Sequence, residues 1–370
     1  MKTVCQINRC TGCRACVDVC PRSAIEVKDS KIAYNAVISE DICINCGACY
    51  RICPNNYPVV YKRPKEWYQG WANDDYIRVQ GSSGGIATAI AKCFIENNGM
   101  VCSCIFKNGE FNFELVNKVE ELKKFSGSKY VKSNPSGIYK VIKDELKNFN
   151  SILFIGLPCQ IAGLKKYIGI ELEKNLYTID LICHGTPSPK VLEIFLEQYG
   201  KRLDEIRSIQ FRKKNKYQIL ENNKGIDTNG ITDKYMIAFF KSLINTENCY
   251  QCNYAKFERV SDITLGDSWG SSLSIKERKK GISLILCQTN KGMQLLKDSN
   301  LCLKDVDINN AIKNNRQLEC SSNRPKQREK FFIEINKNKS FNKLIWKCFP
   351  KDCIKQEIKK ILIKLKFFRG

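Results

Sequence analysis

Cysteines are the residues of this sequence best able to do chemistry, and the chain of 370 residues contains 21 of them. Eight form two runs with one repeated spacing. The runs are Cys10-x-x-Cys13-x-x-Cys16-x-x-x-Cys20-Pro21 and Cys43-x-x-Cys46-x-x-Cys49-x-x-x-Cys53-Pro54. Three thiolates on one tight loop can reach three corners of an iron–sulfur cube, while the fourth cysteine points toward a second cube. A zinc site would use four ligands in two pairs, which is a different pattern.

The doubled spacing is typical of bacterial ferredoxins with two 4Fe-4S clusters. On the ligation rule for such runs, one cluster is held by Cys10, Cys13, Cys16 and Cys53, and the second by Cys43, Cys46, Cys49 and Cys20. We therefore expect residues 1–60 to form a ferredoxin-like α+β module in which a short helix follows each cluster loop.

Four later cysteines suggest a further cluster. Cys159 and Cys183 each follow a short apolar stretch that is typical of a buried strand. Successive strand–helix units usually place their strands side by side, so these two thiols should lie close together. A 4Fe-4S cluster needs four thiolates, and Cys249-x-x-Cys252 supplies only two. Because Cys159 and Cys183 can supply the other two, we predict a third 4Fe-4S cluster held by Cys159, Cys183, Cys249 and Cys252. The alternatives are a redox-active disulfide or unrelated buried thiols, and Cys102-x-Cys104 is a competing pair.

A glycine-rich turn is a candidate anion site. It consists of Gly81, Ser82, Ser83, Gly84 and Gly85, and it precedes an apolar, alanine-rich helix. Free backbone N–H groups at such a turn can bind an anion, although this turn lacks the GxGxxG spacing of dinucleotide sites. Asp267 ends a strand, where a carboxylate can bind a ligand hydroxyl or amine. His184 is the single histidine of the chain, and it either exchanges a proton with a substrate or fixes its loop by hydrogen bonding.

Strands and helices alternate in the large middle part of the chain. Strand, loop and helix follow one another over residues 151–167 and again over residues 176–199. This alternation predicts an α/β core, in which strand-to-loop junctions carry the chemistry. The expected fold class is thus α/β, with the α+β cluster module in front.

The expected boundaries follow from changes in composition. We expect a ferredoxin domain at 1–60, a polar and aromatic linker at 61–75, a large domain at 76–325 with parts 76–150 and 151–325, and a basic tail at 326–370. Apolar residues of the tail fall at helical spacing between lysines. They are Ile354, Ile358, Ile361, Leu362 and Leu365, flanked by Lys355, Lys359 and Lys366. We expect this stripe to pack on the protein's own body, with contact to a membrane surface as the alternative.

The formal net charge of +23 is strongly basic. A basic surface can attract an acidic redox partner, an anionic cofactor, a membrane surface or nucleic acid. We do not expect nucleic acid binding, because the sequence has no recognisable binding module. Residues before Cys5 lack the apolar stretch of a signal peptide, and no stretch has 18 uncharged apolar residues. With eight cysteines in cluster spacing, we expect a reducing, cytoplasmic compartment.

Six motifs in chain order carry a resemblance. They are Gly81-Ser82-Ser83-Gly84-Gly85, Gly127-Ser128-Lys129-Tyr130, Gly156-Leu157-Pro158-Cys159-Gln160, Asp180-Leu181-Ile182-Cys183-His184-Gly185, Cys249-x-x-Cys252 and Asp262-Ile263-Thr264-Leu265-Gly266-Asp267-Ser268-Trp269-Gly270. In this order they resemble the coenzyme F-420 hydrogenase/dehydrogenase beta-subunit family over residues 75–325, with the ferredoxin module fused in front. The resemblance says less about substrate, because the family includes reductases that do not use this deazaflavin.

The resemblance implies an FAD-binding α/β domain. It places Gly81–Gly85, Thr88, Ser128, Lys129 and Tyr130 around the flavin. Clusters carry one electron each, and a flavin is the usual converter to two-electron hydride chemistry. We expect an iron–sulfur flavoprotein oxidoreductase that acts on a small molecule, such as a deazaflavin, and exchanges electrons with a ferredoxin-type or other redox partner protein. The alternative is an electron-relay subunit that has no substrate site and docks on a catalytic partner.

Overall fold

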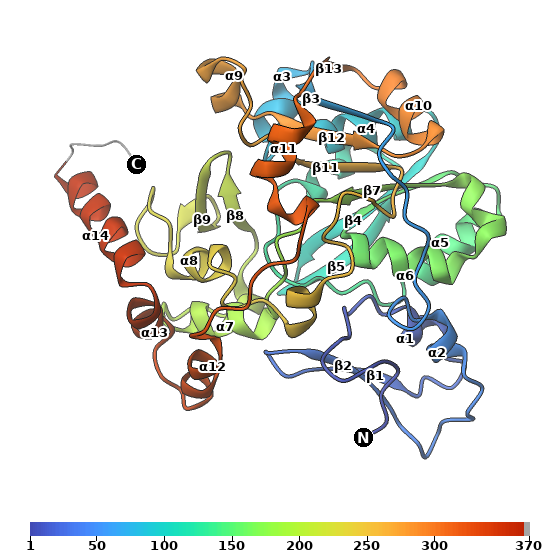
Figure 1. Cartoon of the computed structure of the whole chain (residues 1–370), viewed down its shortest axis with the longest axis horizontal. Helices are drawn as coiled ribbons and strands as arrows, with labels where there is room; N and C mark the ends of the chain where they lie inside the picture. The colour runs from blue at the N-terminus through green and yellow to red at the C-terminus, as the bar shows by residue number, and fades with distance from the viewer. Residues whose placement is uncertain (366–370) are drawn as a thin grey trace.

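The computed structural model describes residues 1–365 and shows a small N-terminal module beside a large mixed sheet (Figure 1). The module contains α1 (Ala15–Val19), β1 (Ile25–Asp29), β2 (Tyr34–Ile38) and α2 (Ala48–Ile52). Its two strands form an antiparallel hairpin. The expected α+β module, with a short helix after each cluster loop, is confirmed.

The two cluster loops have the same backbone path. Arg14 and Gly47 occupy equivalent positions just before α1 and α2, with left-handed φ angles of 63° and 70°. Gly12 and Asn45 are also equivalent, with φ angles of 73° and 52°. Glycine and asparagine adopt this conformation more readily than other residues do. The sequence repeat is therefore also a repeat of backbone geometry.

The large sheet has eight strands in the order β13-β3-β12-β11-β7-β6-β4-β5. The strands are β3 (Glu66–Ala72), β4 (Met100–Lys107), β5 (Glu110–Val116), β6 (Ile152–Gly156), β7 (Leu176–Leu181), β11 (Ile263–Asp267), β12 (Ser283–Cys287) and β13 (Leu301–Lys304). The four adjacent strands β11, β7, β6 and β4 pair in parallel, and the other pairs are antiparallel. The expected α/β core is thus confirmed.

Helices cover both faces of this sheet. One face packs against α4 (Ile86–Glu96) and α10 (Asn290–Asp298), and the other against α5 (Ile138–Lys147) and α6 (Pro158–Ile168). Every residue of β6 is buried. Leu153 and Ile155 face the first pair of helices, while Ile152 and Phe154 face the second. This explains why the sequence of β6 is a continuous apolar run. Three short helices lie at the periphery: α3 (Asp75–Gln80), α9 (Ile275–Lys280) and α11 (Ile308–Asn314).

The expected linker at 61–75 is wrong, because it contains β3, a strand inside the sheet between β12 and β13. Most polar side chains of this segment are exposed, but Gln69 is buried and hydrogen-bonded. Gln69 donates to the carbonyl of Asp305 at 2.8 Å and accepts from Ser271 at 2.6 Å. Gly70 has to lack a side chain, because a Cβ there would lie 2.3 Å from the carbonyl oxygen of Cys302.

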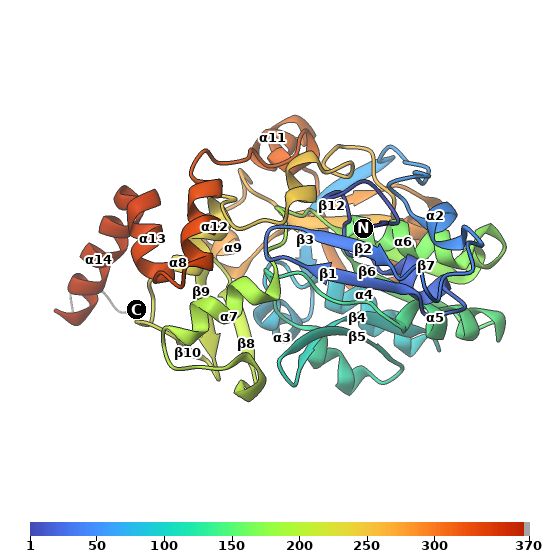
Figure 2. The same cartoon turned by 90° about the horizontal axis from the view of Figure 1, so that it is seen from below.

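A second lobe lies beside the sheet, at the left of Figure 1, and Figure 2 shows its helices from below. It contains α7 (Pro189–Glu197), β8 (Ile209–Lys213), β9 (Lys216–Glu221), β10 (Lys224–Gly225), α8 (Lys234–Phe240), α12 (Arg328–Asn336), α13 (Phe341–Cys348) and α14 (Pro350–Lys364). Phe331, Phe332 and Phe341 of the expected tail are buried in its core. The tail is therefore helical and packed over most of its length. Within residues 1–365, no helix combines the length and apolar composition that crossing a bilayer requires.

The apolar stripe of α14 does not pack on the body, contrary to expectation. Of its five expected members, Ile354, Ile358, Ile361 and Leu365 are between 47% and 60% exposed, and Leu362 is half-buried. The helix instead contacts the lobe through its opposite side, where Cys353 is completely buried. Lys366, which was expected to flank the stripe, lies outside the described residues.

Arg328 of α12 joins the lobe to the other parts of the chain. Its side chain is 1% exposed. It pairs with Glu247 at 3.1 Å and donates to the Tyr250 hydroxyl at 2.9 Å. It also donates to the carbonyls of Ile32 in the N-terminal module, at 3.0 Å, and of Asn245, at 2.8 Å. One buried cation thus ties α12 to the N-terminal module and to the chain just before Cys249.

Replacement of Arg328 by methionine should therefore destabilise the protein by about 3–5 kcal/mol, because Glu247 and two carbonyls would lose a buried partner. Arg324→Met is the matched control. Arg324 contacts the same Glu247 at 3.2 Å but is 41% exposed, so its loss should cost at most about 1 kcal/mol. Denaturant unfolding of both variants measures the difference. Equal destabilisation would show that burial of Arg328 does not matter.

Candidate iron–sulfur and flavin site

The structure gathers the N-terminal cysteines into two groups. Burial, followed by the nearby Cys13, Cys10 and Cys53, raises the pKa of Cys16. Burial, with Cys20 and Cys43 close by, likewise raises the pKa of Cys49. The last cysteine of each run therefore lies with the first three of the other run. This is the crosswise grouping that the ligation rule requires.

The two groups differ in their access to solvent. Cys10, Cys13, Cys16 and Cys53 are each at most 8% exposed. In the other group, Cys46 is exposed and Cys20, Cys43 and Cys49 are half-buried. We call these groups the inner and the outer cysteine site. A redox partner in solution can approach only the outer site directly.

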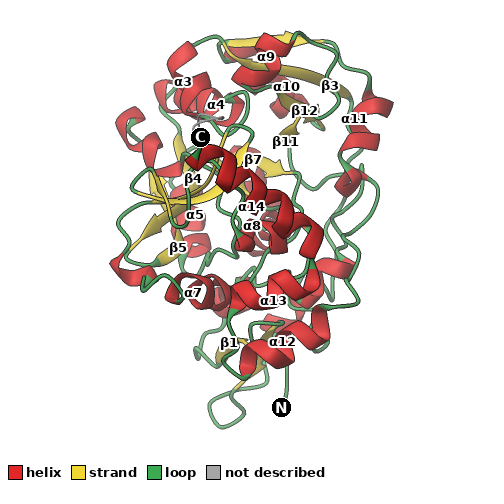
Figure 3. Cartoon of the chain, turned by 90° about the vertical axis from the view of Figure 1, so that its left-hand side faces the viewer, coloured by secondary structure: helices red, strands yellow, loops and turns green. Residues whose placement is uncertain are grey.

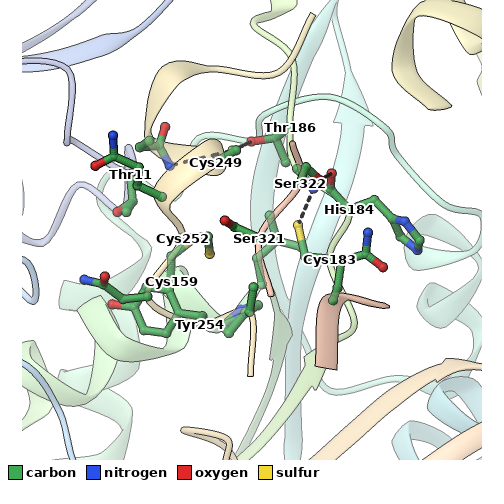
Figure 4. A pocket seen from close by; sticks show the side chains of 18 of the residues that line it. Thr11, Cys159, Cys183, His184, Thr186, Cys249, Cys252, Tyr254, Ser321 and Ser322 are labelled. Carbon is green, nitrogen blue, oxygen red and sulfur yellow. Dashed lines mark hydrogen bonds between the residues drawn. The ribbon is translucent and has the colours of Figure 1, made fainter. Parts of the chain in front are cut away.

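A third group forms where two neighbouring strands end. β6 and β7 pair in parallel, with Gly156 opposite Asp180. Cys159 lies in the first turn of α6, which begins two residues after β6, and Cys183 follows the end of β7. Cys249 and Cys252 come from a 3-10 turn (Glu247–Gln251) and the residue after it. All four side chains line one cavity, as Figure 4 shows.

The four thiols of this third group influence one another electrostatically. Burial raises the pKa of Cys159, and Cys183 and Cys252 raise it further. Burial, with Cys249 as the next contributor, raises the pKa of Cys183 to about 12. A metal cluster would reverse these shifts, since thiolates and not thiols bind iron. Within residues 1–365, no three such side chains meet closely enough to hold a single metal ion. The irons of a cube instead bind their thiolates at separate corners.

The N-terminal module forms one wall of this cavity. Thr11 lines it, and Lys132 donates to the Thr11 carbonyl at 3.1 Å. A hydrogen bond with Cys5 is the main cause of the lowered pKa of Cys10 in the inner site, and the charge of Lys132 adds to it. The same charge partly opposes the raised pKa values of Cys159 and Cys183. Gly163 of α6 allows close contact, because a Cβ there would lie 3.0 Å from the Cys13 sulfur. The inner site therefore abuts α6, whose first turn carries Cys159.

Sequence reasoning did not identify Lys132 or Tyr254 as site residues. Lys132 lies two residues after the motif that ends at Tyr130. Its position next to this motif was the only feature of the sequence that could have identified it. Tyr254 is 4% exposed and lies near Cys13, Cys159 and Cys252, each of which raises its pKa beyond the effect of burial. An aromatic ring thus fills the space between the inner site and the third group.

His184 follows Cys183 and faces away from the cysteines (Figure 4). Its carbonyl accepts hydrogen bonds from Asn245 at 3.1 Å and from Ser322 at 3.0 Å. Burial lowers the pKa of the imidazole, and nearby Asp267 opposes this effect. His184 therefore connects the third group of cysteines to the region of Asp267.

Arg212 of β8 brings the expected flavin residues together. It forms a two-pronged ion pair with Asp267, with contacts of 2.7 Å and 3.2 Å. It also donates to the Tyr130 hydroxyl at 3.2 Å and to the Ser82 carbonyl at 2.8 Å. The Ser128 N–H in turn donates to the Ser82 hydroxyl at 3.0 Å. Three motifs that are far apart in the sequence thus meet at Arg212. Sequence reasoning missed this residue, because a single arginine in a strand belongs to no recognisable motif.

The glycines of the turn have a structural role in the chain's own packing. A Cβ on Gly84 would lie 2.4 Å from the Gly70 carbonyl oxygen, and one on Gly81 would lie 2.9 Å from Gly85. Gly85 has a φ angle of 80°. These glycines are therefore required whether or not a cofactor binds. Thr88 lies in the first turn of α4, after the glycine turn.

Lys214 and Lys129 lie near the glycine turn, and their ammonium groups donate to backbone carbonyls. Lys214 donates to the carbonyls of Ser83, at 2.9 Å, and Arg78. Lys129 donates to the carbonyls of Phe125, Ser126 and Gly127. Among the described residues, neither lysine forms an ion pair. Burial, with Arg78 and Arg212 nearby, lowers the pKa of Lys214 to about 8. Burial also lowers the pKa of Lys129, whose ammonium donates to three carbonyls. Positive charge of this kind can pair with an anionic ligand.

Comparison with known families gives three matches along the chain. Residues 67–140 match "Coenzyme F420 hydrogenase/dehydrogenase, beta subunit N-term", and residues 149–307 match the corresponding C-terminal family. Residues 9–57 match a 4Fe-4S dicluster domain. The two beta-subunit matches together cover more than half of the chain.

Two individual proteins are similar to this chain. The coenzyme F420-dependent sulfite reductase of Methanocaldococcus jannaschii is 24% identical over 308 residues, which are 77% of this chain and 45% of that protein. This chain thus spans about half the length of that relative. A chain of the F420-reducing [NiFe] hydrogenase complex from Methanosarcina barkeri is 18% identical, with a TM-score of 0.49, 69% of this chain covered and 91% of that one. On the family matches, the chain belongs to the coenzyme F420 hydrogenase/dehydrogenase beta-subunit family and has a 4Fe-4S dicluster domain near its N-terminus.

Proposed function

We propose that this protein passes electrons between two N-terminal 4Fe-4S clusters and an FAD, through a third 4Fe-4S cluster. Cys10, Cys13, Cys16 and Cys53 hold the inner cluster, and Cys43, Cys46, Cys49 and Cys20 the outer one. Cys159, Cys183, Cys249 and Cys252 hold the third. The observation that carries this proposal is that the third set of four cysteines lines one cavity, whose wall includes Thr11 of the inner cluster loop.

The order of the sites supports a route for electrons. The outer site is open to solvent, the inner site is buried, and Cys13 of the inner site abuts α6 at Gly163. Cys159 at the start of α6 belongs to the third site, and His184 next to Cys183 faces the Asp267 region. Electrons therefore pass from the outer to the inner cluster, then to the third cluster and to the flavin, or in reverse.

The proposed flavin site is the region around the glycine turn. Ser82, Ser83 and Ser128 offer polar groups, and Lys129 and Lys214 offer the positive charge that two phosphates require. Arg212 holds Asp267 and Tyr130 in position. A bound flavin would convert two single-electron transfers and one proton into one hydride equivalent. His184 is the proposed residue for proton exchange at this site.

The proposed substrate is a deazaflavin of the coenzyme F420 type. Two observations support it: both halves of the large domain match the F420 hydrogenase/dehydrogenase family, and the relative from Methanocaldococcus jannaschii is named for F420. F420 chemistry is hydride transfer, which suits an FAD that is supplied with electrons by clusters. The alternative is a relay subunit that delivers electrons to a catalytic partner. The solvent-facing outer cluster serves either function.

The third cluster predicts a specific iron content. Anaerobically reconstituted protein should hold about 12 irons, at four per cluster. Cys252→Ser should lower this to about eight, together with the matching sulfide. Cys320→Ser is the control, because Cys320 is exposed and belongs to none of the three groups. If Cys252→Ser keeps all of its iron and sulfide, the cavity holds no cluster, and a disulfide or free thiols remain.

Lys214 predicts how FAD affinity depends on pH. Its lowered pKa of about 8 means that the ammonium is present at pH 7 and largely lost at pH 9. FAD should therefore bind more weakly as pH rises through 8, by about tenfold if one charged hydrogen bond is lost. Lys214→Met should bind weakly at both pH values, whereas Lys213→Met, next to it and exposed, should behave as wild type. Equilibrium dialysis of the flavin-depleted protein measures this. The same pH dependence in Lys214→Met would exclude Lys214 from the phosphate site.

Turnover decides between the enzyme and the relay subunit. The isolated holoprotein, given a reduced ferredoxin-type donor, should reduce a deazaflavin of the F420 type, as followed by the loss of its visible absorbance under anaerobic conditions. Cys252→Ser should retain FAD and lose most of this rate, because the path from the clusters is interrupted. If the flavin and the clusters are reduced but the deazaflavin is not, the relay function is correct.

A further inference from the structure

Helix α14 is attached to the protein through its polar side. Among the described residues, four polar contacts join it to the loop and helix around α8, and Cys353 is the single fully buried side chain of the helix. The contacts are Asp352 with Lys241 at 3.1 Å, Gln356 with the Thr232 N–H at 2.9 Å, Glu357 with Lys234 at 2.7 Å and Lys360 with Asp227 at 2.6 Å. The polar residues that normally face water are thus used to hold the helix in place.

The apolar side of α14 faces outward. Ile354, Ile358, Ile361 and Leu365 are spaced by three or four residues, so they lie along one side of the helix. Their exposed fractions are 47%, 53%, 56% and 60%. An amphipathic helix on a globular protein normally turns its apolar side to the core. The reversed orientation here leaves an ordered apolar stripe for another surface.

The charges beside this stripe have one sign. The exposed charged residues of α13 and α14 are all lysines, namely Lys343, Lys347, Lys351, Lys355, Lys359 and Lys364. The two acidic residues of these helices, Asp352 and Glu357, are held in ion pairs with lysines of the body. An approaching surface therefore meets isoleucine, leucine and positive charge.

We propose that α14 binds the surface of an anionic membrane and lies parallel to it. Apolar side chains of such a helix enter the boundary between headgroups and acyl chains, while lysines contact anionic headgroups. The face fits a second copy of this chain less well, because the same lysines would then oppose each other. The exposed side of α14 fits a surface that has negative charge next to an apolar layer. An anionic bilayer has both properties.

The position of α14 in the molecule fits this role. It forms the edge of the second lobe in Figure 1, with the N-terminal module at the lower right. Figure 3 looks onto the face that carries α14 and shows the helix in front of α8. Attachment through this face leaves the outer cysteine site open to solvent. The protein could thus receive electrons from a soluble partner while bound to a membrane.

Co-sedimentation of the full-length holoprotein with vesicles tests the proposal. It should bind vesicles that contain about one-third phosphatidylserine, bind phosphatidylcholine vesicles weakly, and release from the former as salt rises. The double variant Ile358→Glu/Ile361→Glu should lower binding by at least about tenfold, since it places two acids on the apolar stripe. Ile170→Glu is the matched control, because Ile170 is 90% exposed in the turn after α6. Iron content should be the same in all three proteins.

Three results would overturn the proposal. The first is that the wild-type protein stays in the supernatant with anionic vesicles. The second is that vesicle binding is unchanged in the double variant, which would assign binding to another surface. The third is that sedimentation velocity shows a dimer of the wild type that is lost in the double variant, in which case a second copy covers the stripe.

Discussion

The parallel pairing of β6 with β7 is the constraint on which the rest of the site depends. It brings the two strands to the same edge of the sheet, with Gly156 opposite Asp180. Cys159 and Cys183 therefore come together although 24 positions separate them in the sequence. A second buried interaction secures this edge: Arg259 pairs with Asp180 at 2.9 Å, and both side chains are at most 2% exposed. The Cys249–Cys252 turn and the N-terminal module then close the cavity from two sides.

Some of the positively charged side chains are buried, which the net charge of the chain does not reveal. A minority of the cations lie inside the protein, where each has a defined contact. Lys132 lies between two cysteine sites, Arg212 holds Asp267, and Arg328 joins three parts of the chain. The inner cations favour electron-rich groups, because a positive charge stabilises thiolates, reduced clusters and phosphates. Arg212 and Arg328 are paired with carboxylates, so of these three cations only Lys132 adds to the net charge of +23.

Spacing and periodicity predicted the parts of the structure that are encoded locally. The cluster runs fixed the grouping of eight cysteines, and the apolar runs at 152–156 and 176–181 identified the two central strands. Parallel pairing of neighbouring strand–helix units then predicted that Cys159 and Cys183 meet. The interpretation of β3 as a linker failed because its buried polar residue, Gln69, is hydrogen-bonded to distant partners, Asp305 and Ser271. Arg212 and Lys214 escaped notice for the same reason, since their contacts come from residues more than 50 positions away.

The tight contact between Cys13 and α6 has a consequence for how the protein matures. Gly163 leaves so little space at the Cys13 sulfur that the N-terminal module, once docked, covers its inner cysteines. An iron–sulfur donor can reach those thiols only while the module is still apart from the large domain. The outer cysteines stay accessible after folding is complete, because Cys46 is exposed. Insertion of the inner cluster would therefore have to precede docking of the module, whereas the outer site would stay open to an iron–sulfur donor in the folded protein.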